Sequence, residues 1–283
     1  MILALPGNFR VQEYTTRGKI PTFMLGMEDG YALREMIGHA SPDRAPHLVI
    51  HFQTRLMSGL KSATVWGRLP GASEETVYIM AHRDGWFDGA GDNASGVATM
   101  LGLAEYYANV PRAQRRRTII FMGVSGHHGP AVSGPDLLAH RAELFEKTAL
   151  VINAEHTATL QTYLYWNDIR QANTFTAQFW YAGGPARPTL QDIAIRALRS
   201  FGVPTYAAPE RGAPPGDLTP LWRYVPAVTT TDFNMYFHSD GETLETVPWT
   251  GLEATTRAYA KIIDETNRLE LTDLQRPEES AGR

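Results

Sequence analysis

The sequence contains no cysteine among its 283 residues. This absence excludes disulfide bonds, thiolate nucleophiles and cysteine-ligated zinc, and it leaves the redox compartment open. Long apolar runs are missing too: no stretch approaches the roughly 20 residues that cross a bilayer, so we predict no membrane span. The first residues, MILALPGNFRVQ, include a short apolar patch but neither a basic segment nor a clear cleavage site. We therefore predict no signal peptide.

An excess of charge of either sign is also lacking. The 26 basic and 30 acidic residues are interspersed and give a net charge of −4, which argues against a nucleic-acid partner. The one basic run, RAQRRR at residues 112–117, is interpreted as a solvated turn between a helix and a strand. With 43% hydrophobic and 20% charged residues, the chain has the composition of a globular protein. Its length allows one large domain, or one large domain plus a fragment.

Hydrophobic patterning changes at about residue 60. Residues 1–60 are weakly patterned, with a strand-like piece at IPTFMLG and a helix at EDGYALREMIG. From about Ser62 onward, short apolar strands alternate with amphipathic helices, and the tail at residues 271–283 is predicted to be flexible. The strands are expected at residues 63–71, 76–82, 117–124, 148–155 and 226–233, and the helices at residues 94–110, 135–147, 189–202 and 251–270. This alternation predicts an α/β fold, a doubly wound and mostly parallel central sheet with helices on both faces.

Imidazoles and carboxylates follow the predicted apolar strands. In doubly wound folds the carboxyl ends of the strands meet at one edge of the sheet, where the active site lies. We therefore expect these side chains to converge, and neutral imidazole with carboxylate oxygen is a ligand set that suits zinc. The set comprises His82, Asp84, Asp92, His127, His128, Glu155 and His238.

Each of these residues has a simpler interpretation when it is taken alone. Asp92 precedes a predicted helix and would serve as its N-cap. A single histidine at a strand end is more often a hydrogen-bonded polar residue than a ligand. We assign His156, beside Glu155, to a supporting or structural position, and Asp88 to loop polarity. The joint pattern favours a metal site, because unrelated surface residues have no reason to fall at successive strand ends.

Several segments resemble one enzyme family. AHRDG and GAGDNASG are similar to the metal-binding segment of the co-catalytic zinc aminopeptidases, the family-28 metallopeptidases, which include glutamate-carboxypeptidase-like enzymes and glutaminyl cyclases. VINAE resembles the family's next ligand strand, and GDLTPLWRYVPAVTTTDFNMYFHSDGETLETV its closing segment. The resemblance covers roughly residues 62–268 in the family's order and is most specific at DNASG and FHSDGET. It implies that residues 61–270 form a metallopeptidase-like catalytic domain.

The first part of the chain resembles another element of that family. IPTFMLGMEDGYALREMIG is similar to the end of the protease-associated domain that many members insert before the catalytic core. Residues 1–60 would then be an incomplete protease-associated-domain-like segment, which leaves open whether Met1 is the natural start. Most relatives are exported, so the resemblance favours a location outside the cytoplasm.

The resemblance implies two metal ions that share one bridging carboxylate. Asp92 would be the bridge. His82 and Glu155 would complete one metal site, and His128 and His238 would complete the other. The family usually has aspartate where Glu155 stands. Asp84 matches the acid that accepts the imidazole proton of His82.

The pair His127-His128 departs from the family, which normally has two glutamates there. The first glutamate acts as the general base and the second as a metal ligand. His128 can still coordinate zinc, but one negative charge is lost, so the second site should be weaker or more selective. His127 has an ordinary pKa of about 6.5, which suits a base. Two nearby cations would favour its neutral form and could draw it into coordination.

Three functions follow from this ligand set. The one we favour is a metal-dependent, aminopeptidase-like hydrolase of peptide, amide or related acyl bonds, with one or two zinc ions and a small peptide or acyl-amide substrate. The alternatives are a catalytically degenerate homologue that acts as a binding protein, and a glutaminyl cyclase-like acyl transferase. The substrate, the identity of the metal and the oligomeric state are left open. Aromatic residues near the strand ends are candidates for the pocket: Trp86, Phe87, Trp166, Trp180, Tyr181 and Phe237.

Overall fold

A computed structural model provides the structure. It describes residues 4–5, 9–10, 22–53, 55, 57–128, 132–166, 168–175, 179–182, 187–204 and 213–275. No helix in these ranges is both long enough and apolar enough to span a membrane.

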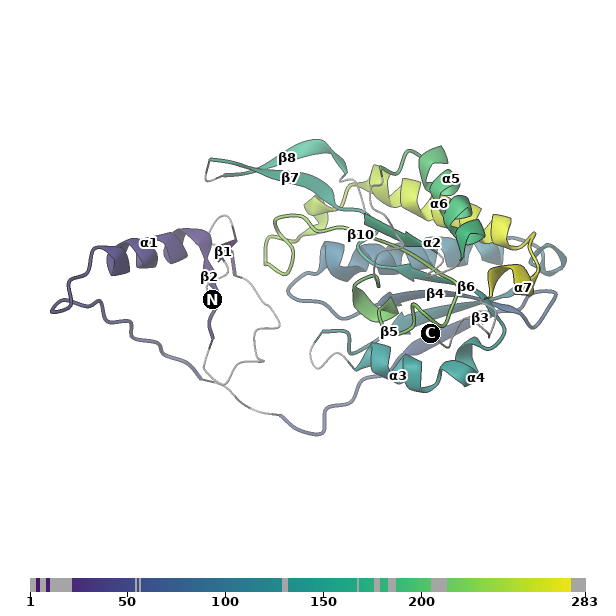
Figure 1. The fold of residues 1–283 in the computed structure, drawn as a ribbon, viewed down its shortest axis with the longest axis horizontal. Coiled ribbons are helices and arrows are strands. Elements are labelled where there is room, and N and C mark those ends of the chain that lie inside the picture. The colour runs from purple at the N-terminus through teal and green to yellow at the C-terminus, as the bar shows by residue number, and fades with distance from the viewer. Residues whose placement is uncertain are drawn as a thin grey trace.

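A six-stranded sheet forms the centre of the molecule (Figure 1). Its strands, in spatial order, are β3 (Val65–Leu69), β5 (Thr118–Val124), β4 (Thr76–His82), β6 (Thr148–Ala154), β10 (Ala227–Thr231) and β9 (Phe179–Ala182). The four inner strands run parallel, while β3 and β9 are antiparallel edges. Every residue of β6 is buried, which is why its sequence is mainly apolar, without a break at residues 149–152.

Helices cover both faces of the sheet. Along β4, Val77 and Ile79 face one side and Tyr78 and Met80 the other, because successive side chains of a strand alternate. The first side packs on α2 (Gly96–Ala108), α5 (Pro188–Ser200) and α6 (Trp249–Thr266). The second side packs on α3 (Ser133–Ala139), α4 (Arg141–Phe145) and the segment around Trp222. In Figure 1, α5 and α6 lie above the sheet and α3 and α4 below it, so the predicted doubly wound fold is confirmed.

The ends of the chain differ in part from the prediction. The N-terminal helix is present as α1 (Met27–Gly38), beside a small parallel pair of β1 (Ala4–Leu5) and β2 (Leu25–Gly26). These elements lie apart from the main sheet in Figure 1. At the other end, the start of the predicted flexible tail is a short helix, α7 (Leu271–Leu274), whose Leu274 is buried. Its Leu274 carbonyl accepts a hydrogen bond from Arg187, and the rest of the tail lies outside the described residues.

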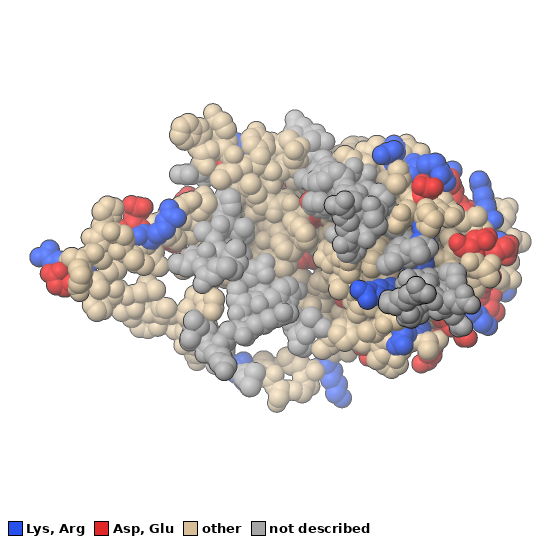
Figure 2. All heavy atoms as spheres, in the orientation of Figure 1, with Lys and Arg blue, Asp and Glu red and all other residues tan. Residues whose placement is uncertain are grey.

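Several smaller elements complete the chain. An antiparallel hairpin of β7 (Leu160–Tyr165) and β8 (Asp168–Phe175) projects from the upper side of the sheet in Figure 1. The hydrophobic pattern did not predict this hairpin, because the side chains of β7 are mostly exposed. The irregular turns are Ala90–Ser95, Arg112–Gln114, Gly216–Leu218 and Leu244–Thr246. On the face shown in Figure 2, basic and acidic side chains are interspersed, in line with the near-balanced charge.

Candidate metal centre

The carboxyl ends of the four parallel strands bring the predicted side chains together. His82 ends β4, His127 and His128 follow β5, Glu155 follows β6, and His238 comes after β10. These imidazoles and Glu155 are buried except for His127, which is half-buried. The predicted convergence at one edge of the sheet is therefore present.

Asp92 lies in the turn before α2, but it does not act as the helix cap. Asn93 takes that part, because its Oδ1 accepts the N–H of Gly96 at 3.1 Å. Asn93 Nδ2 also donates to the carbonyl of Ala154 at 3.0 Å, which ties the start of α2 to the end of β6. A Cβ at Gly96 would collide with that same carbonyl, so glycine is required for the close approach. The segment DNASG thus holds the Asp92 carboxylate at the edge of the sheet.

Four imidazoles surround the Asp92 carboxylate, two at each oxygen. His82 Nε2 and His156 Nε2 each lie 3.0 Å from Asp92 Oδ1. His128 Nε2 lies 3.3 Å and His238 Nε2 2.9 Å from Asp92 Oδ2. We refer to these five residues as the Asp92 centre. Burial acts to raise the pKa of Asp92, but the facing imidazoles, His156 foremost, hold it well below its usual range.

The Asp92 centre fits divalent metal ions. Two ligands of a tetrahedral zinc with bonds of about 2.0–2.1 Å lie about 3.3 Å apart. The separations of 2.9–3.3 Å within the Asp92 centre are close to that spacing. His82 Nε2 is buried and has no hydrogen-bond partner among the described residues. A carboxylate with two imidazoles at each oxygen is therefore suited to bridge two ions.

The three residues predicted for the second metal site lie together in the structure. The three predicted for the first site, His82, Asp92 and Glu155, do not form one group. Asp92, His128 and His238 have ligand atoms within 4.8 Å of one another. On the other oxygen, the group is His82, Asp92 and His156. Glu155 groups instead with His82 and His127. Sequence reasoning missed His156 because it directly follows a residue that the family resemblance identified as the ligand.

Glu155 is held away from Asp92 by its other contacts. Its Oε2 accepts a hydrogen bond from Asn153 Nδ2 at 2.6 Å. Gly216, with a φ of +79°, leaves no room for a Cβ beside the Glu155 carboxylate. Glu155 Oε1 lies 3.9 Å from His127 Nε2. The glutamate therefore faces the candidate base, and its predicted role as a metal ligand stays a prediction.

Asp84 also acts through different atoms from those predicted. The backbone carbonyl of Asp84, not its carboxylate, lies 2.9 Å from His82 Nδ1. The nearest carboxylate oxygen is 4.0 Å away from that nitrogen. The carboxylate instead accepts the backbone N–H of His128 at 2.9 Å and that of His127 at 3.4 Å. Asp84 thus fixes the position of the histidine pair as well as the tautomer of His82.

His127 forms a dyad with an acid that the sequence pattern did not reveal. Its Nδ1 lies 3.2 Å from Asp217 Oδ1, and the Ser133 hydroxyl donates to the same carboxylate. Burial acts to lower the pKa of His127, but the hydrogen bond and charge of Asp217, with Glu155 and Asp92, raise it to about 9. Asp217 lies in a short turn, not at the end of an apolar strand, so the strand-end rule did not select it. A bound dication would oppose the rise in pKa by charge repulsion.

Glu242 supports the Asp92 centre through two backbone hydrogen bonds and was also missed. Its Oε1 accepts the backbone N–H of Asp92 at 2.9 Å, and its Oε2 accepts that of His238 at 3.1 Å. Burial is the main reason that the pKa of Glu242 is raised to about 7. The glutamate lies in the segment FHSDGET, where its only sequence signal was the resemblance itself.

A pocket opens onto the centre and is lined in part by aromatic rings. Phe233, Phe237, Pro215 and Gly216 border it together with residues of the centre. Of the predicted pocket aromatics, Phe237 lies here. Trp86 packs 5.3 Å from the His128 ring, Phe87 and Trp166 are exposed, and the side chains of Trp180 and Tyr181 lie outside the described residues.

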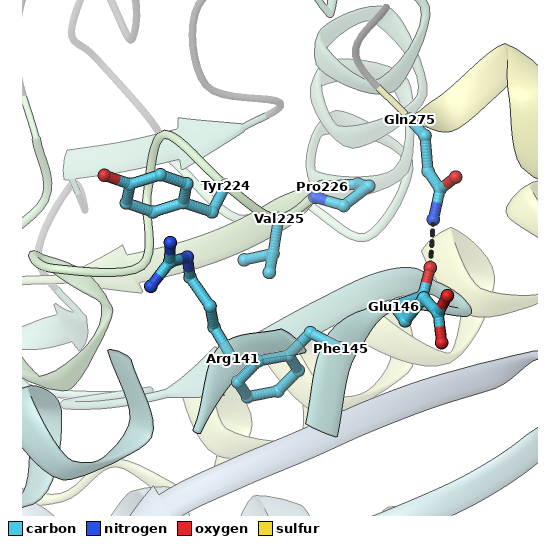
Figure 3. Close-up of a pocket in the computed structure, with 7 residues that line it drawn as sticks. All are labelled: Arg141, Phe145, Glu146, Tyr224, Val225, Pro226 and Gln275. Carbon is cyan, nitrogen blue, oxygen red and sulfur yellow. Dashed lines mark hydrogen bonds between the residues drawn. The ribbon is translucent and has the colours of Figure 1, made fainter. Parts of the chain in front are cut away.

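A second pocket lies at the opposite edge of the sheet, where β6 and β10 begin (Figure 3). The guanidinium of Arg141 stacks over the ring of Tyr224 at 4.9 Å, and Gln275 donates to the carbonyl of Glu146 at 2.9 Å. No imidazole is among the described residues that line this pocket, so the histidines of the candidate metal centre all lie at the other edge of the sheet.

Solved structures with the same fold were found among peptidases and related enzymes. A peptidase M28 precursor from Shewanella amazonensis has a TM-score of 0.65 at 17% identity, over 96% of this chain and 59% of that one. BSAP, a zinc aminopeptidase from Bacillus subtilis, has a TM-score of 0.56 at 15% identity, over 75% and 53%. A glutaminyl cyclase from an Acidobacteriales bacterium has a TM-score of 0.52 at 17% identity, over 72% and 73%. The chain thus spans little more than half the length of the two peptidases.

Sequence comparison points to the same group. No curated protein matches the chain at a significant level. A family model described as peptidase family M28 matches residues 64–263, which include all of the Asp92 centre. The matched region begins at the first strand of the sheet and ends within α6. The chain belongs to peptidase family M28.

Proposed function

We propose that the chain is a metal-dependent hydrolase of peptide, amide or related acyl bonds, with aminopeptidase-like activity on small peptides. The observation that carries this proposal is the Asp92 carboxylate with two imidazoles at each oxygen. Zinc bound there would supply Lewis acidity toward a carbonyl oxygen and toward an attacking water. Family membership supports the reaction class, and the zinc aminopeptidase fold supports the choice of metal.

We assign the transfer of the proton in this reaction to His127. Its Nδ1 is engaged by Asp217, so Nε2 is the atom left to exchange a proton with the nucleophile. The ring stacks on that of His82 at 3.8 Å, which places it directly beside the Asp92 centre. Asp217 holds the ring orientation and stabilises the imidazolium that forms when a proton is taken up. Glu155, whose Oε1 lies 3.9 Å from His127 Nε2, adds negative charge that favours the imidazolium.

The pocket residues serve to bind and to exclude water. Phe233 and Phe237 pack edge to face at 4.6 Å and border the pocket together. Apolar rings at this position would cover the scissile bond of a small substrate and lower the local dielectric. The similarity in fold to a glutaminyl cyclase makes acyl transfer the competing reaction at the same site.

The test is metal analysis followed by a substrate panel. Protein purified without chelator, and again after zinc dialysis, should contain stoichiometric metal. It should then hydrolyse aminoacyl anilides or esters, lose that activity with chelator and regain it with zinc. Cyclisation of a glutaminyl peptide without hydrolysis would favour the acyl transferase, and metal binding without turnover would favour the binding protein. Absence of metal under both conditions would contradict all three.

A further inference from the structure

His156 lies inside the Asp92 centre although its neighbour Glu155 was the predicted ligand. The chain leaves β6 at Ala154 and adopts a left-handed conformation at His156, with a φ of +47°. This turn directs the imidazole inward, where 2% of the residue is exposed. Its Nε2 lies 3.0 Å from Asp92 Oδ1, the same separation as that of the accepted candidate His82.

The hydrogen bonds of the two imidazoles fix which nitrogen faces Asp92. His156 Nδ1 lies 2.9 Å from the carbonyl oxygen of Asp232, and His82 Nδ1 lies 2.9 Å from that of Asp84. A carbonyl oxygen only accepts, so the proton of each neutral ring is on Nδ1. Each ring then presents the lone pair of Nε2 to a carboxylate oxygen. Backbone carbonyls commonly orient metal-binding histidines in this way.

Glu155 is not available to the same ion in this arrangement. Asn153 donates to its carboxylate, and Gly216 packs against it. None of the ligand groups among the described residues contains both Asp92 and Glu155. The carboxylate faces His127, on the side of the proposed base.

We infer that His156 is a metal ligand of the first site, with His82 and Asp92 Oδ1, in the place predicted for Glu155. The inference rests on the metal binding that the proposed function requires. Both sites then have the same donors, two imidazoles and one oxygen of Asp92. A nitrogen-rich set with a single carboxylate favours zinc, cobalt, nickel and copper over magnesium, calcium and manganese.

The experiment compares three variants as metal-free proteins: His156→Gln, Glu155→Gln and His140→Gln. Zinc is titrated into each against a chromophoric chelator, and cobalt is titrated while its visible absorption is recorded. His156→Gln should weaken one of the two sites at least about tenfold and change the cobalt spectrum, since even residues that only orient a ligand are worth 10–100-fold. Glu155→Gln should keep both sites. His140 is exposed at the C-terminal end of α3, and its ring bonds to the carbonyl of Asp136 in that helix. The zinc affinities and cobalt spectrum of His140→Gln should therefore match those of the wild type.

The opposite result would overturn the assignment. If His156→Gln kept both affinities and the wild-type cobalt spectrum while Glu155→Gln lost one site, Glu155 is the ligand and the proposed function still stands. A wild-type protein that binds no divalent ion would overturn the proposed function itself, and His156 with it. Thermal unfolding of the metal-free variants shows whether they fold.

A measurement on an otherwise intact centre covers the case in which His156→Gln does not fold. Zinc is added to ¹⁵N-histidine-labelled His127→Ala protein, and the ring nitrogens are followed by long-range ¹⁵N NMR. Four Nε2 resonances should move to the shift of metal-bound nitrogen, one for each imidazole of the Asp92 centre. Three would overturn the inference.

Discussion

At the scale of single residues, the Asp92 carboxylate is the point where four side chains meet. Its buried negative charge faces four imidazoles, and Glu242 accepts its backbone N–H. Removing this carboxylate would take away the anion that all four imidazoles face. Removing one imidazole would leave the other three in place. The two kinds of change should therefore differ in severity.

We expect Asp92→Ala to abolish metal binding at both sites, and His82→Ala to lose the first site while weakening the second. Any hydrolytic activity should fall with the metal content. His140→Ala is the matched control, since His140 is exposed and its ring contacts Asp136, which is not part of the Asp92 centre. Elemental analysis and turnover on one substrate panel provide the readout. The placement of the site would be wrong if His140→Ala lost metal as His82→Ala does.

His127→Ala should separate catalysis from metal binding. Its imidazole contacts Asp217 and Glu155 but is not part of the Asp92 centre. We expect the zinc content to be retained and the rate to fall about 10²–10⁴-fold, the usual effect of losing a positioned acid–base group. An unchanged rate for a confirmed activity would show that His127 is not the base.

At the scale of elements, the start of α2 and the end of β6 meet backbone to backbone. Gly96 allows this contact, because any Cβ there would collide with the Ala154 carbonyl. A Cβ added at Gly102, in the middle of the same helix, would meet Thr256 at 3.6 Å, which is an ordinary van der Waals contact. Replacing each of these glycines by alanine should therefore have opposite effects on the stability of the folded chain.

Gly96→Ala should lower the free energy of unfolding by roughly 1–3 kcal/mol, as overpacking of a tight contact does. Gly102→Ala should raise it by roughly 0.5–1 kcal/mol, because alanine is the better helix former. Denaturant unfolding of both variants measures the two changes. Equal effects of the same sign would contradict the role given to Gly96.

The sequence predicted elements better than it predicted contacts. The apolar runs of β4, β5 and β6 located the strands, and the rule that ligands follow parallel strands located His82, His128 and His238. The order of the strands was not predicted, because it depends on pairing between distant segments. His156, Asp217 and Glu242 lie in turns whose direction is set by the packed fold. No local pattern shows where such a side chain points.

At the scale of the whole molecule, the Asp92 centre joins segments that are far apart in the chain. Its side chains come from the ends of four neighbouring strands and from the turn before α2. An ion bound there would link all of them in the folded state and none of them in the unfolded state. Metal binding should therefore add to global stability by mass action.

We expect zinc at about 100 times its dissociation constant to stabilise the folded chain by about 2.7 kcal/mol per site. For a domain of this size the midpoint of thermal unfolding should rise by roughly 5–10 °C, and chelator should reverse the rise. Calorimetry of Asp92→Ala serves as the control, since that variant should not respond to zinc. A wild-type midpoint that is independent of zinc would argue against ligation by the folded centre.

The position of His238 late in the chain has a consequence for biosynthesis. Among the described elements, only the turn Leu244–Thr246 and the helices α6 and α7 follow it. A nascent chain of which only β4 and α2 have left the ribosome could bind an ion through His82 and Asp92, but it would lack the remaining imidazoles of the Asp92 centre. Complete loading would have to wait until nearly the entire domain has left the ribosome, so the time of metal uptake would mark the completion of this domain.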